Sequence, residues 1–170
     1  IRTAQGQLSL SQSSFVFLAA VGGFSPPSQL LRVANTGQGN VQWSIPSADL
    51  VNAPWLTFSP QAGVSSAGGS SSTILSVNPG NRAAGTYQVL VLVTASGAAN
   101  DPQLISVTLL VVGAGTTPSA LLSPNGMTFV SQVNGGQVPP QTLTISNGGA
   151  GGLNINLVAS TTSGGPWLGI

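Results

Sequence analysis

The dipeptide Pro-Trp followed by Leu occurs twice, with the tryptophans at positions 55 and 167, and this separation of 112 residues aligns much of the preceding sequence. The alignment needs no gap from Leu10 and Leu122 to Leu56 and Leu168. Matching pairs include Phe17 with Phe129, Pro27 with Pro139, Leu31 with Leu143, and Asn35 with Asn147. Self-similarity at a fixed period indicates a repeat, and 112 residues is an ordinary domain length.

The repeat predicts the domain organisation of the chain. We expect a first complete module over residues 1–113, with its core beginning at about residue 7, and a linker over residues 114–119. Residues 120–170 then form the front half of a second module. Because half a sandwich leaves an open core and unpaired strand edges, we expect either a longer tandem array or completion by strands of a neighbouring chain.

Alternation of apolar and polar residues predicts strands throughout the first module. Val41, Trp43 and Ile45 alternate with polar residues, and their counterparts Leu153, Ile155 and Leu157 keep the same parity. Further strands are expected over 8–10, 15–18, 29–34, 73–77, 86–94 and 103–112. We expect residues 61–72, rich in Gly and Ser, to form a loop. No stretch has helical periodicity, so the fold class is all-β: an immunoglobulin-like antiparallel β-sandwich, one complete repeat plus the first half of a second.

Charged residues make up only 3% of the chain, with three Lys or Arg, two Asp or Glu, no His and no Cys. Three scattered cations cannot form the basic surface that nucleic acids require, so a nucleic-acid partner is excluded. General acid–base catalysis lacks its usual side chains, and we therefore expect no enzyme activity, no catalytic residues, no metal site and no cofactor. The longest apolar runs, 89–93 and 109–112, are too short to span a bilayer.

Three motifs carry a resemblance to a known family. They are Trp55-Leu56-x-Phe58-Ser59-Pro60-x-x-Gly63, Leu75-x-Val77-Asn78-Pro79, and Gly85-Thr86-Tyr87 before alternating valines. This series resembles the immunoglobulin-like tandem repeats of bacterial secreted proteins, in particular the BACON type. The resemblance implies secretion or a cell-surface location, tandem arrays, and roles as spacers, adhesins or glycan-binding modules. It implies no catalytic residues.

Two pairs of strand residues have apolar side chains where a solvent-facing sheet should be polar. Leu90 and Leu92 have the parity opposite to Val91, and Leu110 and Val112 have the parity opposite to Leu109. Consecutive strands joined by a short turn usually pair, so these four side chains are expected on one outer sheet face. Exposed apolar patches mark contact surfaces, and this face is our candidate packing interface between repeats or subunits. A loop or linker folded over it is the alternative.

Trp55 and Trp167 are candidates for stacking on a glycan, because aromatic rings offer sugars an apolar face. The competing interpretation is that a recurrent Trp beside Leu closes one end of the sandwich. The sequence thus favours an extracellular structural repeat (a spacer, stalk, adhesin or filament subunit) whose partners are copies of itself or neighbouring repeats. A carbohydrate-binding BACON-like module of a larger secreted protein, with a glycan as partner, is the alternative.

Overall fold

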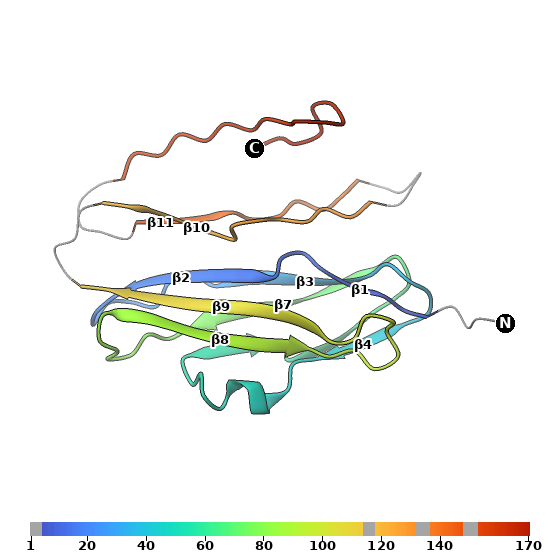
Figure 1. The fold of residues 1–170 in the computed structure, drawn as a ribbon, viewed down its shortest axis with the longest axis horizontal. Coiled ribbons are helices and arrows are strands. Elements are labelled where there is room, and N and C mark those ends of the chain that lie inside the picture. The colour runs from blue at the N-terminus through green and yellow to red at the C-terminus, as the bar shows by residue number, and fades with distance from the viewer. Residues whose placement is uncertain (1–4, 114–117, 132–136, 148–152) are drawn as a thin grey trace.

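Two sheets face each other in the first part of the chain, and a smaller pair of strands lies over one edge of them (Figure 1). The computed structural model describes residues 5–113, 118–131, 137–147 and 153–170. The first sheet has the strand order β1-β3-β7-β5 and is antiparallel throughout. Its strands are β1 (Leu8–Leu10), β3 (Gln29–Asn35), β7 (Ser70–Val77) and β5 (Leu56–Ser59).

The second sheet has the order β2-β9-β8. Its strands are β2 (Ser14–Ala20), β9 (Gln103–Val112) and β8 (Gly85–Val93). A ribbon of β4 (Val41–Ser44) and β6 (Ala62–Ser65) continues this layer, because Ser44 forms a bridge to Thr94 just after β8. A short 3₁₀ helix, η1 (Ser47–Leu50), follows β4. The predicted immunoglobulin-like β-sandwich is confirmed.

The core lies between the two layers and follows the period-two alternation of the sequence. Leu31 and Val91 are 0% exposed and Trp43 is 1% exposed, as the parity of their strands predicts. Burying an aliphatic or aromatic side chain of this size stabilises a fold by about 1.5–3 kcal/mol. The other fully buried large side chains are Phe15, Phe17, Leu75, Ile105, Leu109, Val33, Val41, Val93 and Val107.

One strand pair departs from the expected antiparallel arrangement, because β2 runs parallel to β9, with Phe17 opposite Leu109. The chain leaves β1 at Leu10, crosses from the first sheet to the second, and continues in the same direction as β2. A strand that changes sheets without a turn keeps its direction, and here that direction matches β9. Sequence alternation reports which face a residue occupies but carries no information on strand direction.

The prediction of a loop over residues 61–72 is wrong in part, since β6 lies over Ala62–Ser65 and β7 begins at Ser70. Gly63, one of the glycines in residues 61–72 that suggested a loop, has a packing role in β6. It lies opposite Trp43 in the β4–β6 pair, and a Cβ atom built on it would lie 2.6 Å from Cζ2 of the indole. Glycine is therefore required in this strand because the Trp43 ring packs directly against the backbone.

The second part of the chain repeats the strand pairing of the first part. Strand β10 (Ala120–Ser123) pairs antiparallel with β11 (Thr144–Asn147), and Leu122 lies opposite Ile145. In the first module Leu10 lies opposite Val33, which is the same register displaced by the repeat length. A side-chain hydrogen bond recurs as well. The amide of Gln7 donates to Oδ1 of Asn35 at 3.0 Å, and the amide of Ser119 donates to Oδ1 of Asn147 at 3.2 Å.

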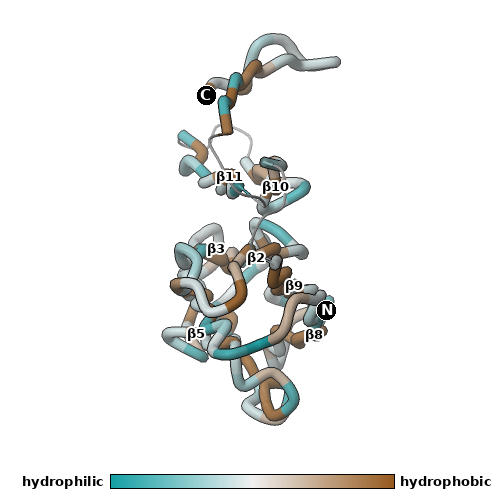
Figure 2. The backbone as a smooth tube through the Cα atoms, turned by 90° about the vertical axis from the view of Figure 1, so that its left-hand side faces the viewer, coloured by the Kyte–Doolittle hydropathy of each residue, from teal (hydrophilic) through white to brown (hydrophobic). Residues whose placement is uncertain are grey.

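Other features of the first module have no equivalent in residues 118–131, 137–147 and 153–170, the described residues of the second part. Residues 153–157, predicted as a strand, form no strand, because no partner strand lies beside them among the described residues. Phe17 is buried in β2, whereas Phe129 is half-buried and outside any strand. Residues 114–117 of the predicted linker lie outside the described part of the chain. Figure 2 shows the residues after 153 as a further layer beyond β10 and β11.

Candidate interaction surfaces

The four residues of the predicted packing interface lie on the outer side of the second sheet, since their neighbours Val91 and Leu109 are fully buried. Leu90 is 61% exposed, and Leu92, Leu110 and Val112 are half-buried. The strand register separates them into two groups. Gln88 lies opposite Thr108 between the groups, and Nε2 of Gln88 donates to Oγ1 of Thr108 at 3.1 Å.

The first group, which we call the outer patch, consists of Leu90, Leu92 and Leu104. Leu92 lies directly opposite Leu104 on β9, and Leu104 is 49% exposed. Leu104 was not among the residues predicted for the packing interface, although its parity, opposite to that of buried Ile105, was sufficient to place it outside. Cross-strand aliphatic neighbours of this kind are in contact range on one face of a sheet.

The second group is partly covered by β2. Leu110 lies beside Leu18, and Val112 lies beside Ala20, in the parallel β2–β9 register. Leu18 is 9% exposed and lies outside the main core, so it is buried on this outer side. The sequence predicted that Leu110 and Val112 lie on the outer face, but it did not predict that β2 pairs with β9 beside them. Leu110 and Val112 therefore contribute less open surface than the outer patch.

Among the described residues, the outer edge of β8 has hydrogen-bond partners only at its C-terminal end. Oδ2 of Asp49 accepts a hydrogen bond from the amide of Leu92 at 2.9 Å. The backbones of Ser44 and Thr94 exchange bonds of 2.8 and 2.9 Å. Asp101 has a similar role, since its Oδ1 accepts from the amide of Ala95 at 2.7 Å. Both carboxylates thus bind backbone amides, which stabilises the end of β8 and the turn after it.

The two recurrent tryptophans have different surroundings. Trp55 is 4% exposed and belongs to the core, so it offers no open ring face to a sugar. Trp167 is 62% exposed; its ring meets that of Phe129 edge to face at 6.3 Å, and its Nε1 donates to the carbonyl of Ser163 at 3.3 Å. Of the two glycan-stacking candidates, only Trp167 has an accessible face.

The second part of the chain contacts the first module through the edge of β2. The amide of Val16 donates to Oγ of Ser123 at 2.7 Å, and this hydroxyl donates to Oε1 of Gln29 at 2.8 Å. Nε2 of Gln29 in turn donates to the carbonyl of Val16 at 2.8 Å. Ser123 and Gln29 are both buried, and the ring of bonds satisfies the backbone N–H and C=O of Val16 on an edge strand.

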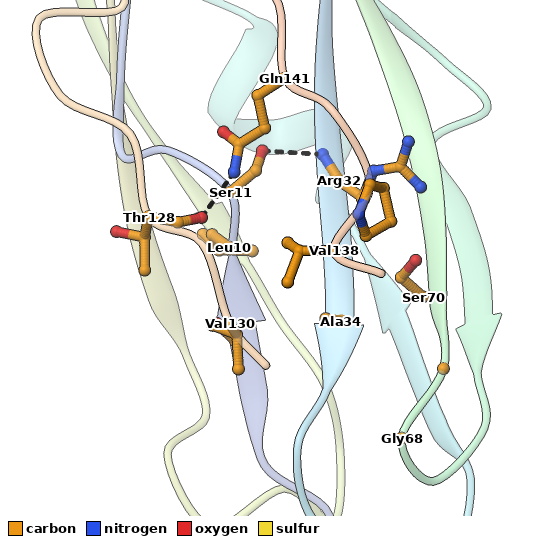
Figure 3. Close-up of a pocket in the computed structure, with 13 residues that line it drawn as sticks. Leu10, Ser11, Arg32, Ala34, Gly68, Ser70, Thr128, Val130, Val138 and Gln141 are labelled. Atoms are coloured by element: carbon orange, nitrogen blue, oxygen red, sulfur yellow. Dashed lines mark hydrogen bonds between the residues drawn. The ribbon is translucent and has the colours of Figure 1, made fainter. Parts of the chain in front are cut away.

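A reciprocal contact lies nearby, around the cavity drawn in Figure 3. The amide of Thr128 donates to the carbonyl of Ser11 at 3.1 Å, and Nε2 of Gln141 donates to the carbonyl of Thr128 at 2.6 Å. The Gln141–Thr128 bond is the equivalent of the Gln29–Val16 bond at the repeat distance. A neighbouring cavity of ≈ 130 Å³ is lined by equivalent residues of both copies: Ser28 and Pro140, Gln29 and Gln141, Leu30 and Thr142, and Arg32 and Thr144.

Neither a metal cluster nor a membrane-spanning helix is found in the described residues. No group of three or more His, Cys, Asp or Glu side chains lies together there. The short 3₁₀ helix η1 does not approach the length or apolarity needed to cross a bilayer.

Solved structures resemble this chain in fold. No family model matches the sequence, and no curated protein matches it significantly. The ASH/PapD-like domain of human CEP192 (PapD-like domain 7) is similar with a TM-score of 0.51 at 15% identity, over 65% of this chain and 88% of that chain. WR4, an MSP family member of C. elegans, has a TM-score of 0.43 at 13% identity, over 62% of this chain and 98% of that one.

The E. coli chaperone DraB has a TM-score of 0.44 at 13% identity, over 61% of this chain and 54% of the chaperone chain. At these identities the likeness concerns the fold alone. Together with the sheet order described above, the similarity to the human PapD-like domain shows that the chain contains an immunoglobulin-like β-sandwich.

Proposed function

We propose that this chain is a non-catalytic structural module of a secreted or cell-surface protein, a spacer, stalk, adhesin or filament repeat that packs against copies of itself. The observation that carries the proposal is the outer patch. Leu90, Leu92 and Leu104 form a cross-strand apolar group on a solvent-facing sheet, with Leu90 61% and Leu104 49% exposed. Contiguous apolar side chains on such a face are typical of a protein contact surface.

The charge distribution supports a contact made by apolar burial. The chain has a net charge of +1 and 3% charged residues, so copies neither repel one another strongly nor need ion pairs to associate. Association of this kind depends little on ionic strength, because salt screens charges and leaves apolar burial in place. A role outside the cell, where salt and pH vary, is compatible with this property.

The repeated register of β1–β3 and β10–β11 supports a tandem arrangement of modules. The BACON-type assignment depends on the sequence motifs around Trp55, Leu75 and Gly85, and we retain it as part of the proposal.

Substitution of the outer patch tests the proposal. In the variant Leu90→Thr/Leu92→Thr/Leu104→Thr, threonine keeps strand propensity but removes most of the apolar surface. We expect self-association, followed by sedimentation velocity and electron microscopy of the chain, to weaken at least tenfold while the melting temperature stays within a few degrees. The matched control is Val51→Thr, which changes an exposed valine (74%) that lies outside the sheets. Unchanged association in the triple variant would contradict the proposal, as would equal loss in the control.

Glycan binding is the second candidate, and the exposure of Trp167 favours it. A glycan array probed with the full chain and with Trp167→Ala separates it from the structural role. Saturable binding that the substitution abolishes supports a carbohydrate-binding module, whereas binding to no glycan, or binding that survives the substitution, counts against it.

A further inference from the structure

Strand β8 is a long edge of the first module without the usual protection. It has nine residues, pairs with β9 without a bulge, and contains no charged residue and no proline. The edge strands β1, β5 and β6 have three or four residues each, and the edge of β2 is covered at Val16 by Ser123 and Gln29. Proteins usually protect a long edge with lysine, proline or a bulge, because a bare edge is a template for pairing with another chain.

The backbone groups that β8 directs to its free side follow from the bond at its C-terminal end. The amide of Leu92 donates to Oδ2 of Asp49, on the side away from β9. Because bonding direction alternates along an antiparallel strand, Thr86, Gln88 and Leu90 direct their N–H and C=O groups to the same side. Among the described residues these groups have no protein partner. We call the three residues the open edge.

The open edge is complementary to itself in one register. Two antiparallel copies of β8, related by a two-fold axis at Gln88, place Thr86 of each copy opposite Leu90 of the other. Every N–H and C=O group of the open edge then has a partner, and the contact is isologous. A shifted axis would place one of these residues opposite either Ala84, which precedes the strand, or Leu92, whose amide is already bound.

The charges near β8 are compatible with the same arrangement. Arg82 lies just before the strand, and Asp49 binds the amide of Leu92 near its C-terminal end. An antiparallel pair brings the beginning of each strand to the end of the other, so opposite charges of the two copies approach at both ends. Close to a two-fold axis each position approaches its own equivalent, and a charge there would repel its copy. The open edge carries none.

We infer that two copies of this chain associate through the open edge of β8, which joins two three-stranded sheets into one continuous sheet. The inference rests on the proposed function, which makes copies of the chain its partner, and it names the edge and the register of the contact. A two-fold axis perpendicular to the sheet leaves both outer patches on one face of the joined sheet. The open edge and the outer patch can therefore be tested separately.

Cysteine cross-linking tests the register, because the chain contains no cysteine of its own. Residues opposite each other in a hydrogen-bonded antiparallel pair have Cα atoms about 5.5 Å apart, which is within disulfide range. Under mild oxidation the full chain with Gln88→Cys should form a disulfide-linked dimer roughly tenfold faster than Thr57→Cys, at an exposed residue of edge strand β5. Thr86→Cys and Leu90→Cys should cross-link rapidly with each other and slowly alone.

Proline at position 88 tests the backbone groups. Gln88→Pro removes an N–H that takes no part in the β8–β9 ladder, a position where an edge strand tolerates proline. Gln88→Thr is the matched control, since it also removes the side-chain bond to Thr108 but keeps the N–H. Sedimentation equilibrium of the full chain should show a dimer dissociation constant about tenfold higher for Gln88→Pro than for Gln88→Thr, because each copy loses one donor of the contact.

Hydrogen exchange of the natural sequence tests the same groups without a substitution in β8. The amides of the open edge should exchange about tenfold more slowly at a concentration where the chain is dimeric than where it is monomeric. The amides of Tyr87 and Val89 bond to β9 and should be protected at both concentrations. This comparison decides the question if Gln88→Pro disturbs the fold of the first module.

The outcomes separate this inference from the proposed function. Self-association that leaves the open-edge amides unprotected, or equal cross-linking of Gln88→Cys and Thr57→Cys, would overturn the inference and leave packing through the outer patch in place. Dimers that persist in Leu90→Thr/Leu92→Thr/Leu104→Thr with protected open-edge amides would support the inference and contradict the outer patch as the contact. Absence of self-association up to about 1 mM chain would overturn both.

Discussion

The amide of Val16 donates to Oγ of Ser123 at 2.7 Å, and the equivalent amide of the second copy, that of Thr128, donates to the carbonyl of Ser11, the equivalent of Ser123, at 3.1 Å. Each copy therefore presents the same two positions to the other. A contact in which residue i meets j while j meets i is isologous, and it closes on itself. Any further module in an assembly has to use a different surface, and the outer patch is one that remains open.

Replacing Ser123 with alanine should loosen the second part of the chain from the first. The buried amide of Val16 loses its acceptor and Oε1 of Gln29 loses its donor, which costs about 1–3 kcal/mol of local stability. Hydrogen exchange at the Val16 amide should accelerate by roughly five- to hundredfold if exchange follows local opening. The control is Ser160→Ala, at an exposed serine. Unchanged protection of Val16 in the Ser123 variant would show that the contact does not hold the two parts together.

Gly63→Ala should destabilise the first module, because the new Cβ would lie 2.6 Å from Cζ2 and 2.8 Å from Cε2 of Trp43. The indole is 1% exposed and cannot move away without disturbing the core, and overpacking of this kind costs about 1–3 kcal/mol. Thermal unfolding monitored by tryptophan fluorescence measures the effect. Gly126→Ala is the control, since nothing lies within 4 Å of a Cβ at that position. A melting temperature equal in both variants would contradict the close packing of Trp43 on β6.

Ser71→Ala removes the acceptor of a buried indole. Nε1 of Trp43 donates to Oγ of Ser71 at 2.7 Å, and Oγ of Ser71 lies 2.9 Å from Oγ of Ser65, which donates to the carbonyl of Val33 at 2.7 Å. An unsatisfied buried donor costs about 1–3 kcal/mol, so the free energy of unfolding in urea should fall by that amount. Ser72→Ala, at the neighbouring half-buried serine, should change it by less than about 0.5 kcal/mol. Equal effects of the two substitutions would argue against the Trp43–Ser71 bond.

Side-chain alternation predicted the first module well because burial on one face of a strand is a local property of the sequence. Leu31, Trp43 and Val91 lie in the core as their parity requires. The pairing of Leu10 with Val33 recurs at the repeat distance as the pairing of Leu122 with Ile145, although the sequence did not predict which strands pair. Strand direction and strand neighbours depend on contacts between distant residues. For this reason the parallel β2–β9 pair, and with it the covering of Leu110 by Leu18, could not be predicted.

Candidate surface residues were predicted less completely for the same reason. Parity placed Leu90 and Leu92 outside, but only the register of β8 with β9 shows that Leu104 joins them and that Gln88 and Thr108 separate them from Leu110. Gly63 illustrates a second limit. A glycine in a stretch rich in Gly and Ser indicates a loop. The structural reason for this glycine is the ring of Trp43, which lies twenty residues earlier in the chain.

Asn35→Ala should be the most destabilising polar substitution of the first module. Oδ1 of Asn35 accepts from the amides of Gln7 at 3.0 Å and Gly37 at 2.9 Å, and Nδ2 donates to the carbonyl of Gly39 at 2.8 Å. The side chain is 1% exposed, so alanine leaves several backbone groups without partners, and we expect a loss of about 2–4 kcal/mol in the free energy of unfolding.

Two comparisons complete this experiment. Asn40→Ala, at an exposed asparagine in the same turn, should be neutral within about 0.5 kcal/mol. Asn147→Ala removes the equivalent bond from the Ser119 amide. Among the described residues, β10 and β11 form only a two-stranded sheet. We therefore expect faster hydrogen exchange of the β10 and β11 amides and an unchanged main unfolding transition. A main transition lowered equally by Asn147→Ala and Asn35→Ala would show that the two parts of the chain unfold as one unit.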